Sequence, residues 1–94
     1  MKRVKNLKNR VVELIAEQEG AYGYETGTAL VRSRSGLHYA EHWGFRWSGQ
    51  TGGAYLDTYR LDDVEVAELS RVLTARYIHS EAVLAAAEWI AMKS

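Results

Sequence analysis

The hydrophobic residues near the start of the chain recur at helical spacing. They lie three or four positions apart, with a polar residue closing the series: Val4, Leu7, Val11, Leu14 and Gln18. This spacing predicts an amphipathic helix over residues 3–19, which Gly20 would end by adopting a left-handed conformation. The charges of this segment, basic first and acidic last, oppose the helix dipole, so packing must hold the helix in place.

The middle of the chain changes to the two-residue alternation of strands. Extended segments are predicted over Thr28–Arg34, Leu37–Ser48 and Ala54–Leu61. A tight turn at Arg34-Ser35-Gly36 and a glycine-rich loop over Gly49–Gly53 would join them. Two short loops between three strands predict an antiparallel meander.

A helical pattern returns after the third strand. Asp62 and Glu65 have the spacing of a capping box, which marks a helix start. A helix unbroken to Lys93 would be about 48 Å long, so we expect a bend at Tyr77–Ser80, with Ser80 capping a last helix. The predicted fold class is α+β in a single domain, residues 1–94: an N-terminal helix, a three-stranded antiparallel β-meander, and one bent or two C-terminal helices.

The last predicted helix is apolar nearly all round. Val83, Leu84, Ala87 and Ile90 occupy one side, and the other carries Ala82, Ala85, Ala86 and Trp89. Such a helix is either deeply buried or packed against another copy. In so small a protein we expect a homo-oligomer, such as a dimer, formed through this alanine-rich helix.

The predicted central strand separates two kinds of side chain. Its odd positions carry Leu37, Tyr39, Trp43, Phe45 and Trp47, with Glu41 as the exception. We expect this aromatic face to lie against the helices and the opposite face to lie in solvent. Matching the three strands, the solvent face gathers arginines and histidines, which form either a partner-binding surface or an ordinary solvated face: Arg32, Arg34, His38, His42, Arg46 and Arg60. A bulge at Gly44 would invert the alternation beyond it and move Arg46 to the other face.

Composition narrows the functional class. The 94 residues include 12 basic and 12 acidic side chains and no cysteine, so no net charge attracts nucleic acid and no disulfide or thiolate metal site can form. The basic residues of the first ten positions have no acid among them. No apolar stretch approaches the roughly 20 residues that cross a bilayer, so we expect no membrane partner and a cytoplasmic protein (in the host cytoplasm, if a virus encodes it).

Motifs for catalysis or metal binding do not fit the predicted elements. His38-Tyr39-Ala40-Glu41-His42 matches H-x-x-E-H, which binds zinc only on a helix. On a strand the two histidines would stand about 13 Å apart, so we expect no metal. Burial would raise the pKa of Glu41, as in a catalytic acid, but we expect instead either a neighbouring arginine or exposure at the strand end. The glycine loop lacks the Lys-Ser/Thr of a P-loop, so we expect no cofactor and assign no catalytic residue.

Three functions remain open at this level. The first is a non-enzymatic binding protein, of the kind of small regulator or inhibitor that phages and mobile elements encode, engaging a protein or nucleoprotein through the arginine–histidine face. The second is a nucleic-acid-binding domain, because double-stranded-RNA-binding domains share the order helix, three strands, helix. The third is a small anionic-ligand-binding protein or enzyme, with its site in a dimer cleft. We favour the first.

Overall fold

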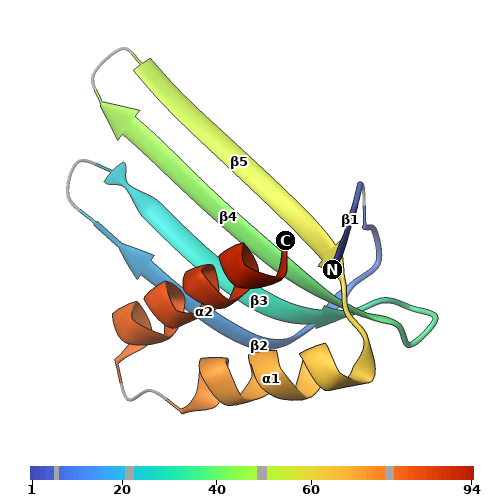
Figure 1. Cartoon of the computed structure of the whole chain (residues 1–94). Coiled ribbons are helices and arrows are strands. Elements are labelled where there is room, and N and C mark those ends of the chain that lie inside the picture. Colours follow the sequence, from blue (N-terminus) through green and yellow to red (C-terminus); the bar gives the residue numbers. More distant parts are fainter. Residues whose placement is uncertain (6, 21–22, 49–50, 76–77) are drawn as a thin grey trace.

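The computed structural model describes residues 1–5, 7–20, 23–48, 51–75 and 78–94, except the side chains of 47, 48 and 51. Within these residues, five strands precede two helices (Figure 1): β1 (Lys2–Val4), β2 (Val11–Glu19), β3 (Glu25–Arg32), β4 (His38–Ser48), β5 (Thr51–Arg60), α1 (Asp63–Thr74) and α2 (His79–Lys93). The α+β class, the antiparallel sheet and two C-terminal helices are as predicted. None of the described helices is long and apolar enough to cross a membrane.

The strands form one antiparallel sheet in the order β1-β5-β4-β3-β2. Strands β1 and β2 are consecutive in the chain but lie at opposite edges, so the chain between them passes from one edge to the other. Its described residues, 5 and 7–10, are hereafter called the crossing segment. The two chain termini lie close together, because the Met1 amino group is 3.5 Å from the carbonyl oxygen of Lys93 at the end of α2.

The predicted N-terminal helix is wrong, because residues 11–19 form the edge strand β2. Its register against β3 shifts between Val12 and Leu14, which marks a β-bulge. The added residue places apolar side chains on both faces, with Leu14 packed against the core and Ile15 exposed. Apolar residues on both faces of this bulged strand therefore happen to follow one another at the three- and four-residue intervals of a helix. The β-branched side chains of Val11, Val12 and Ile15 were the signal for a strand.

The turns agree more closely with the sequence. Gly36 has a φ of 89°, and its amide donates to the carbonyl oxygen of Ser33 at 3.0 Å, in the predicted turn. Pairing of β4 with β5 is regular through Gly44, which faces Tyr55, so no bulge inverts the alternation there. Of the predicted Gly49–Gly53 loop, residues 51–53 belong to β5, and 49–50 lie outside the described residues.

The two helices begin in different ways. Before α1, the Asp62 carboxylate accepts from the Glu65 amide at 2.8 Å and Glu65 accepts from the Asp62 amide, which confirms the capping box. Helix α2 begins at His79 after Ile78, without a side-chain cap, so the predicted cap at Ser80 is wrong. Tyr77, in the predicted bend, lies outside the described residues. The helices are joined to each other by Trp89, whose indole nitrogen donates to Glu68 at 2.8 Å.

Both helices pack on one face of the sheet, over β2 and β3 (Figure 1). The core there combines small residues of sheet and helix with larger aliphatic ones: Ala16, Leu30, Ala40, Leu61, Leu69, Leu73, Ala82, Val83, Ala86 and Ile90. The alanines predicted to join two copies are thus partly used within the chain, because Ala82 and Ala86 are buried against its own sheet.

The covered face is the opposite of the one predicted. Ala40 belongs to the core, so the helices lie on the side of the even-numbered residues of β4, which also include His38 and His42. The odd-numbered residues Tyr39, Glu41, Trp43 and Phe45 and their cross-strand partners form the other side, hereafter the open face. The alternation was predicted correctly, but the helices cover the face that carries small side chains, and the aromatic rings lie outside.

Candidate functional site

The six predicted partner-binding residues divide between the two faces. Arg32 and His38 are cross-strand partners on the helix side, and Arg34 is exposed in the turn between them. Arg60 pairs with Tyr39 on the open face. These four residues gather at one end of the sheet, whereas His42 lies further along β4 and Arg46 is exposed towards its far end.

Two of the gathered side chains share one carboxylate. Nε2 of His38 lies 2.6 Å from Glu13, and Nε of Arg32 lies 3.6 Å from the other oxygen of the same carboxylate. Glu13 stands at the bulge of β2, which places it beside these two residues. One carboxylate therefore contacts both side chains, and Glu13 offsets the charge of Arg32 within the chain.

Arg60 stabilises the junction between the sheet and the first helix. Its guanidinium donates to the carbonyl oxygens of His38, at 3.1 Å, and of Leu61. It also stacks over the Tyr39 ring, 5.6 Å from the centroid. These contacts hold the guanidinium near the end of β5, and part of its hydrogen-bonding capacity is already satisfied.

His42 belongs to a separate polar cluster on the helix side. Its Nδ1 lies 2.8 Å from the Thr28 hydroxyl and its Nε2 lies 3.4 Å from the Tyr55 hydroxyl. Burial lowers the pKa of His42 below its usual value, and nearby Asp57 partly opposes that shift. Among the described residues, no three His, Cys, Asp or Glu side chains lie close enough together to hold a metal ion.

One pocket that was not predicted lies where the crossing segment passes over the open face. This cationic pocket has a volume of about 420 Å³, and its lining includes four basic residues of the first ten positions: Arg3, Lys5, Lys8 and Arg10. Arg3 pairs with Asp57 at 2.5 Å and Arg10 pairs with Glu41. Lys5 and Lys8 form no ion pair with any described residue, so their charges are available to a ligand. The acid-free run of cations was visible in the sequence, but its place on the sheet was not.

Glu41 lies beneath this pocket and is almost fully buried, with 4% of its surface exposed. Burial raises the pKa of Glu41 above its usual value, and the Arg10 guanidinium lowers it by a smaller amount. The pairing with Arg10 also anchors the end of the crossing segment to the centre of the sheet, because β4 is the middle strand.

Ionisation of Glu41 should lower the stability of the fold. The pKa of Glu41 is higher in the folded than in the unfolded chain. The protonated Glu41 carboxyl therefore contributes its full stabilisation of the fold below pH 4.5, and this stabilisation is lost as the pH rises through the folded pKa. We therefore expect Glu41→Gln to unfold at a higher denaturant concentration than the parent at pH 7, with a smaller difference at pH 4. Urea titrations of both proteins at the two pH values measure this; a variant less stable at pH 7 would contradict it.

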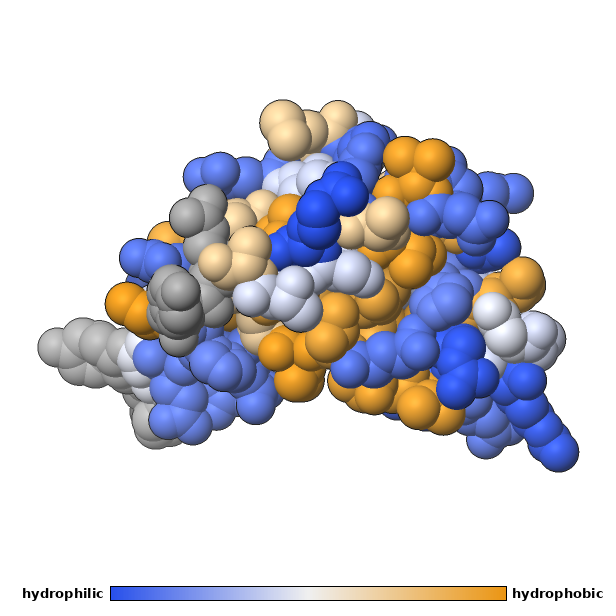
Figure 2. Space-filling view, turned by 90° about the horizontal axis from the view of Figure 1, so that it is seen from below, coloured by the Kyte–Doolittle hydropathy of each residue, from blue (hydrophilic) through white to orange (hydrophobic). Residues whose placement is uncertain are grey.

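An apolar hollow of about 330 Å³ adjoins the cationic pocket, and Arg10, Glu41 and Leu56 line both. Its other walls are Val12, Ile15, Ala29 and Trp43. Large apolar side chains here remain in contact with solvent, with exposed fractions of 45% for Val12, 43% for Ile15 and 59% for Leu56. Seen from the side of α1 and the β2 edge, hydrophobic residues gather across the middle of the molecule and polar residues occupy its ends (Figure 2).

Three acidic residues stand at the far corner of the open face. Glu17 pairs with Gly27, Glu19 with Glu25, and Glu25 with Phe45, so all three carboxylates share the face of Trp43. All three are exposed. This acidic corner belongs to β2 and β3, whereas the cationic pocket lies towards β1 and β5 at the other end of the strands. The open face is thus basic at one corner, apolar in the middle and acidic at the opposite corner.

Comparison with known protein families, curated proteins and solved structures finds no match for this chain, so the geometry of the open face is the basis for its functional interpretation.

Proposed function

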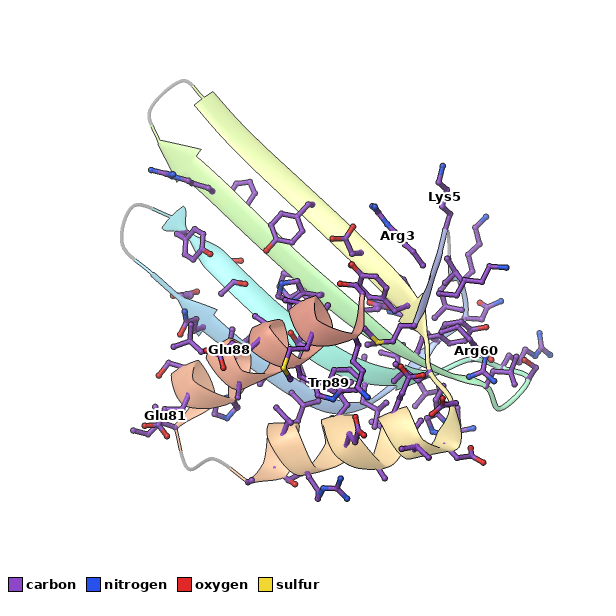
Figure 3. All side chains as sticks on the ribbon, viewed as in Figure 1. Arg3, Lys5, Arg60, Glu81, Glu88 and Trp89 are labelled. Atoms are coloured by element: carbon purple, nitrogen blue, oxygen red, sulfur yellow. The ribbon has the colours of Figure 1, made fainter. Side chains whose placement is uncertain are left out.

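We propose that this protein is a non-enzymatic binding protein that engages an acidic surface of a macromolecular partner through the basic end of its sheet. The observation that carries the proposal is the cationic pocket, in which Lys5 and Lys8 have no acidic partner among the described residues. Arg3, Lys5 and Arg60 extend from the same end of the molecule, while Glu81 and Glu88 lie along α2 (Figure 3). The exposed Arg34 adds a further cation at the same end.

The neighbouring apolar hollow favours a protein over a nucleic acid as the partner. A polyanionic backbone offers phosphates but little aliphatic surface, whereas an acidic protein surface combines carboxylates with apolar side chains. Twelve acids also balance the twelve bases of the chain, so no overall field attracts nucleic acid. The likeness to double-stranded-RNA-binding topology does not hold, because the chain begins with strands.

The size of the cationic pocket supports a second candidate, binding of a small anion. About 420 Å³ lies within the usual range of small-molecule sites, roughly 300 to 1,000 Å³. The pocket is open on the sheet, however, and a small ligand would leave the exposed Leu56 and Ile15 in solvent. A protein surface accounts for both the cations and the apolar residues.

Reversing the two lysine charges tests the proposal. We expect Lys5→Glu combined with Lys8→Glu to weaken binding of a fluorescent peptide rich in Asp, Glu and Leu by at least about ten-fold in low salt, equivalent to 1.4 kcal/mol. Fluorescence anisotropy measures the affinity, and added salt should reduce it in the parent protein. Inorganic polyphosphate and a DNA duplex, titrated in parallel, test the other two ligand classes.

The matched control reverses two exposed cations away from the pocket, Arg46→Glu with Arg71→Glu. The net charge changes equally, so an unchanged affinity would show that position, and not total charge, determines binding. Equal losses in both double variants would refute the proposed site. Tighter binding of the DNA duplex than of the peptide would instead favour the nucleic-acid alternative.

A further inference from the structure

We infer that a second copy of this chain covers the open face, so that two sheets stack face to face and the acidic corner of each lies over the cationic pocket of the other. The inference rests on the proposed function, because it names the acidic surface that the basic end receives. It places self-association on the sheet and not on the alanine-rich helix.

The apolar middle of the open face provides the contact area. Val12, Ile15, Phe45 and Leu56 each expose more than 40% of their surface, and Trp43 lies between them. A contiguous apolar patch ringed by charges is typical of a protein interface. A standard interface buries about 800 Å² on each partner, which a sheet face can supply in a molecule measuring 41 × 30 × 23 Å.

The charge pattern fits a two-fold axis. Lys2 and Arg60 pair at the β1–β5 corner, and Glu19 and Glu25 pair at the β2–β3 corner, at opposite ends of the strands. A two-fold axis lying between the stacked sheets, perpendicular to the line that joins these corners, brings each corner of one copy over the opposite corner of the other. The same rotation stacks apolar middle on apolar middle. One surface therefore supplies both halves of a symmetric contact.

The exposed surface of α2 does not have this property. Leu84 and Met92 are exposed there, but Glu81 and Glu88 border Leu84. A two-fold contact through Leu84 would bring these acids of both copies together, and the residues that line the surface around Leu84 in the described part of the chain include no cation. Like charges brought together in this way disfavour association.

Two leucines of nearly equal exposure separate the two surfaces experimentally. Leu56 on the open face is 59% exposed and Leu84 on α2 is 60% exposed. In sedimentation equilibrium we expect the parent chain to approach twice its 10.6 kDa mass as concentration rises. Leu56→Asp should weaken the dimer by about 100-fold, whereas Leu84→Asp should leave it unchanged. The opposite result would overturn the inference and identify α2 as the interface.

Charge exchange provides a second test that misfolding cannot imitate. Glu17→Lys with Glu25→Lys should weaken the dimer by about ten-fold, and so should Lys5→Glu with Lys8→Glu. Mixing the two double variants should restore association as a heterodimer at both charged contacts, because one variant is then basic at both corners and the other is acidic at both. Combining all four substitutions in one chain should likewise restore both contacts of the homodimer. Absence of recovery in the fourfold variant, with a folded spectrum, would overturn the inference.

The inference and the proposed function fail in different ways. A parent chain that stays at 10.6 kDa at every concentration, yet binds the acidic peptide through Lys5 and Lys8, refutes the dimer alone. The opposite result is also possible to recognise: the parent dimerises, Leu56→Asp dissociates it, and the monomer does not bind the acidic peptide. That result refutes the proposed function and, with it, the charged part of the dimer contact.

Discussion

Replacing Leu69 by alanine should lower the free energy of unfolding by about 3 kcal/mol, within the range of about 2 to 5 kcal/mol found for buried leucines. Leu69 lies in the middle of α1, is fully buried, and belongs to the core between the helices and the sheet. The substitution removes three carbon atoms, a methine and two methyl groups, and leaves a cavity that a packed interior closes only in part. Urea denaturation followed by circular dichroism measures the loss.

Val64 provides the control on the same helix. It is 66% exposed, and Val64→Ala should change stability by no more than about 0.5 kcal/mol, because a surface substitution loses little packing. A loss below about 1 kcal/mol for Leu69→Ala would contradict the position of α1 against the sheet. Equal effects at both residues would contradict it as well.

Gly27→Ala should destabilise the fold by about 1 to 3 kcal/mol. In most strands this substitution would be favourable, because glycine loses more conformational freedom on folding than alanine does. Gly27 pairs with Trp43 across β3 and β4, and a Cβ atom added to it would overlap the six-membered ring of the indole. The ring therefore lies directly on the glycine backbone and would have to leave it. Thermal or urea unfolding measures the cost.

Two comparisons isolate that contact. Gly53 also lies in a strand, but a Cβ atom added there would meet nothing within 4 Å, so Gly53→Ala should cost little. In a Trp43→Ala background, Gly27→Ala should lose its destabilising effect, because the overlapping ring is gone. Persistence of the cost in that background would show that the strain arises elsewhere.

The features predicted correctly from sequence depend on residues close together in the chain. Asp62 and Glu65 form a capping box because the capping residue and its partner lie three positions apart in any such motif. The turn at Gly36 needs one residue at positive φ, and glycine supplies it. Local geometry decides both, so no tertiary contact was needed to predict them.

The first twenty residues were misread because their structure depends on distant partners. β1 has only three residues, and its pairing with β5 joins Lys2 to Arg60, far along the chain. No local pattern indicates such a strand. In β2 the bulge before Leu14 interrupts the alternation of apolar and polar residues that would have identified the segment as a strand.

The candidate site was only partly predictable for the same reason. Arginines and histidines were assigned to one solvent face, but the structure divides Arg32 and His38 from Arg60 and covers much of the helix side. A pairing of Glu41 with an arginine was one of two arrangements predicted for this carboxylate, whereas the identity of Arg10 required the crossing segment. Lys5 and Lys8 reach the open face only because β1 and β2 occupy opposite edges.

By itself, the sequence determined which side chains share a face of β4, because the pleat of a strand repeats every two residues whatever surrounds it. It did not determine which of those faces the helices cover. That choice belongs to the tertiary structure, since it depends on how closely Ala82 and Ala86 of α2 can approach Ala16, Leu30 and Ala40 across the whole fold. Small side chains permit that approach and large rings do not, so the aromatic residues of the central strand remain on the open face.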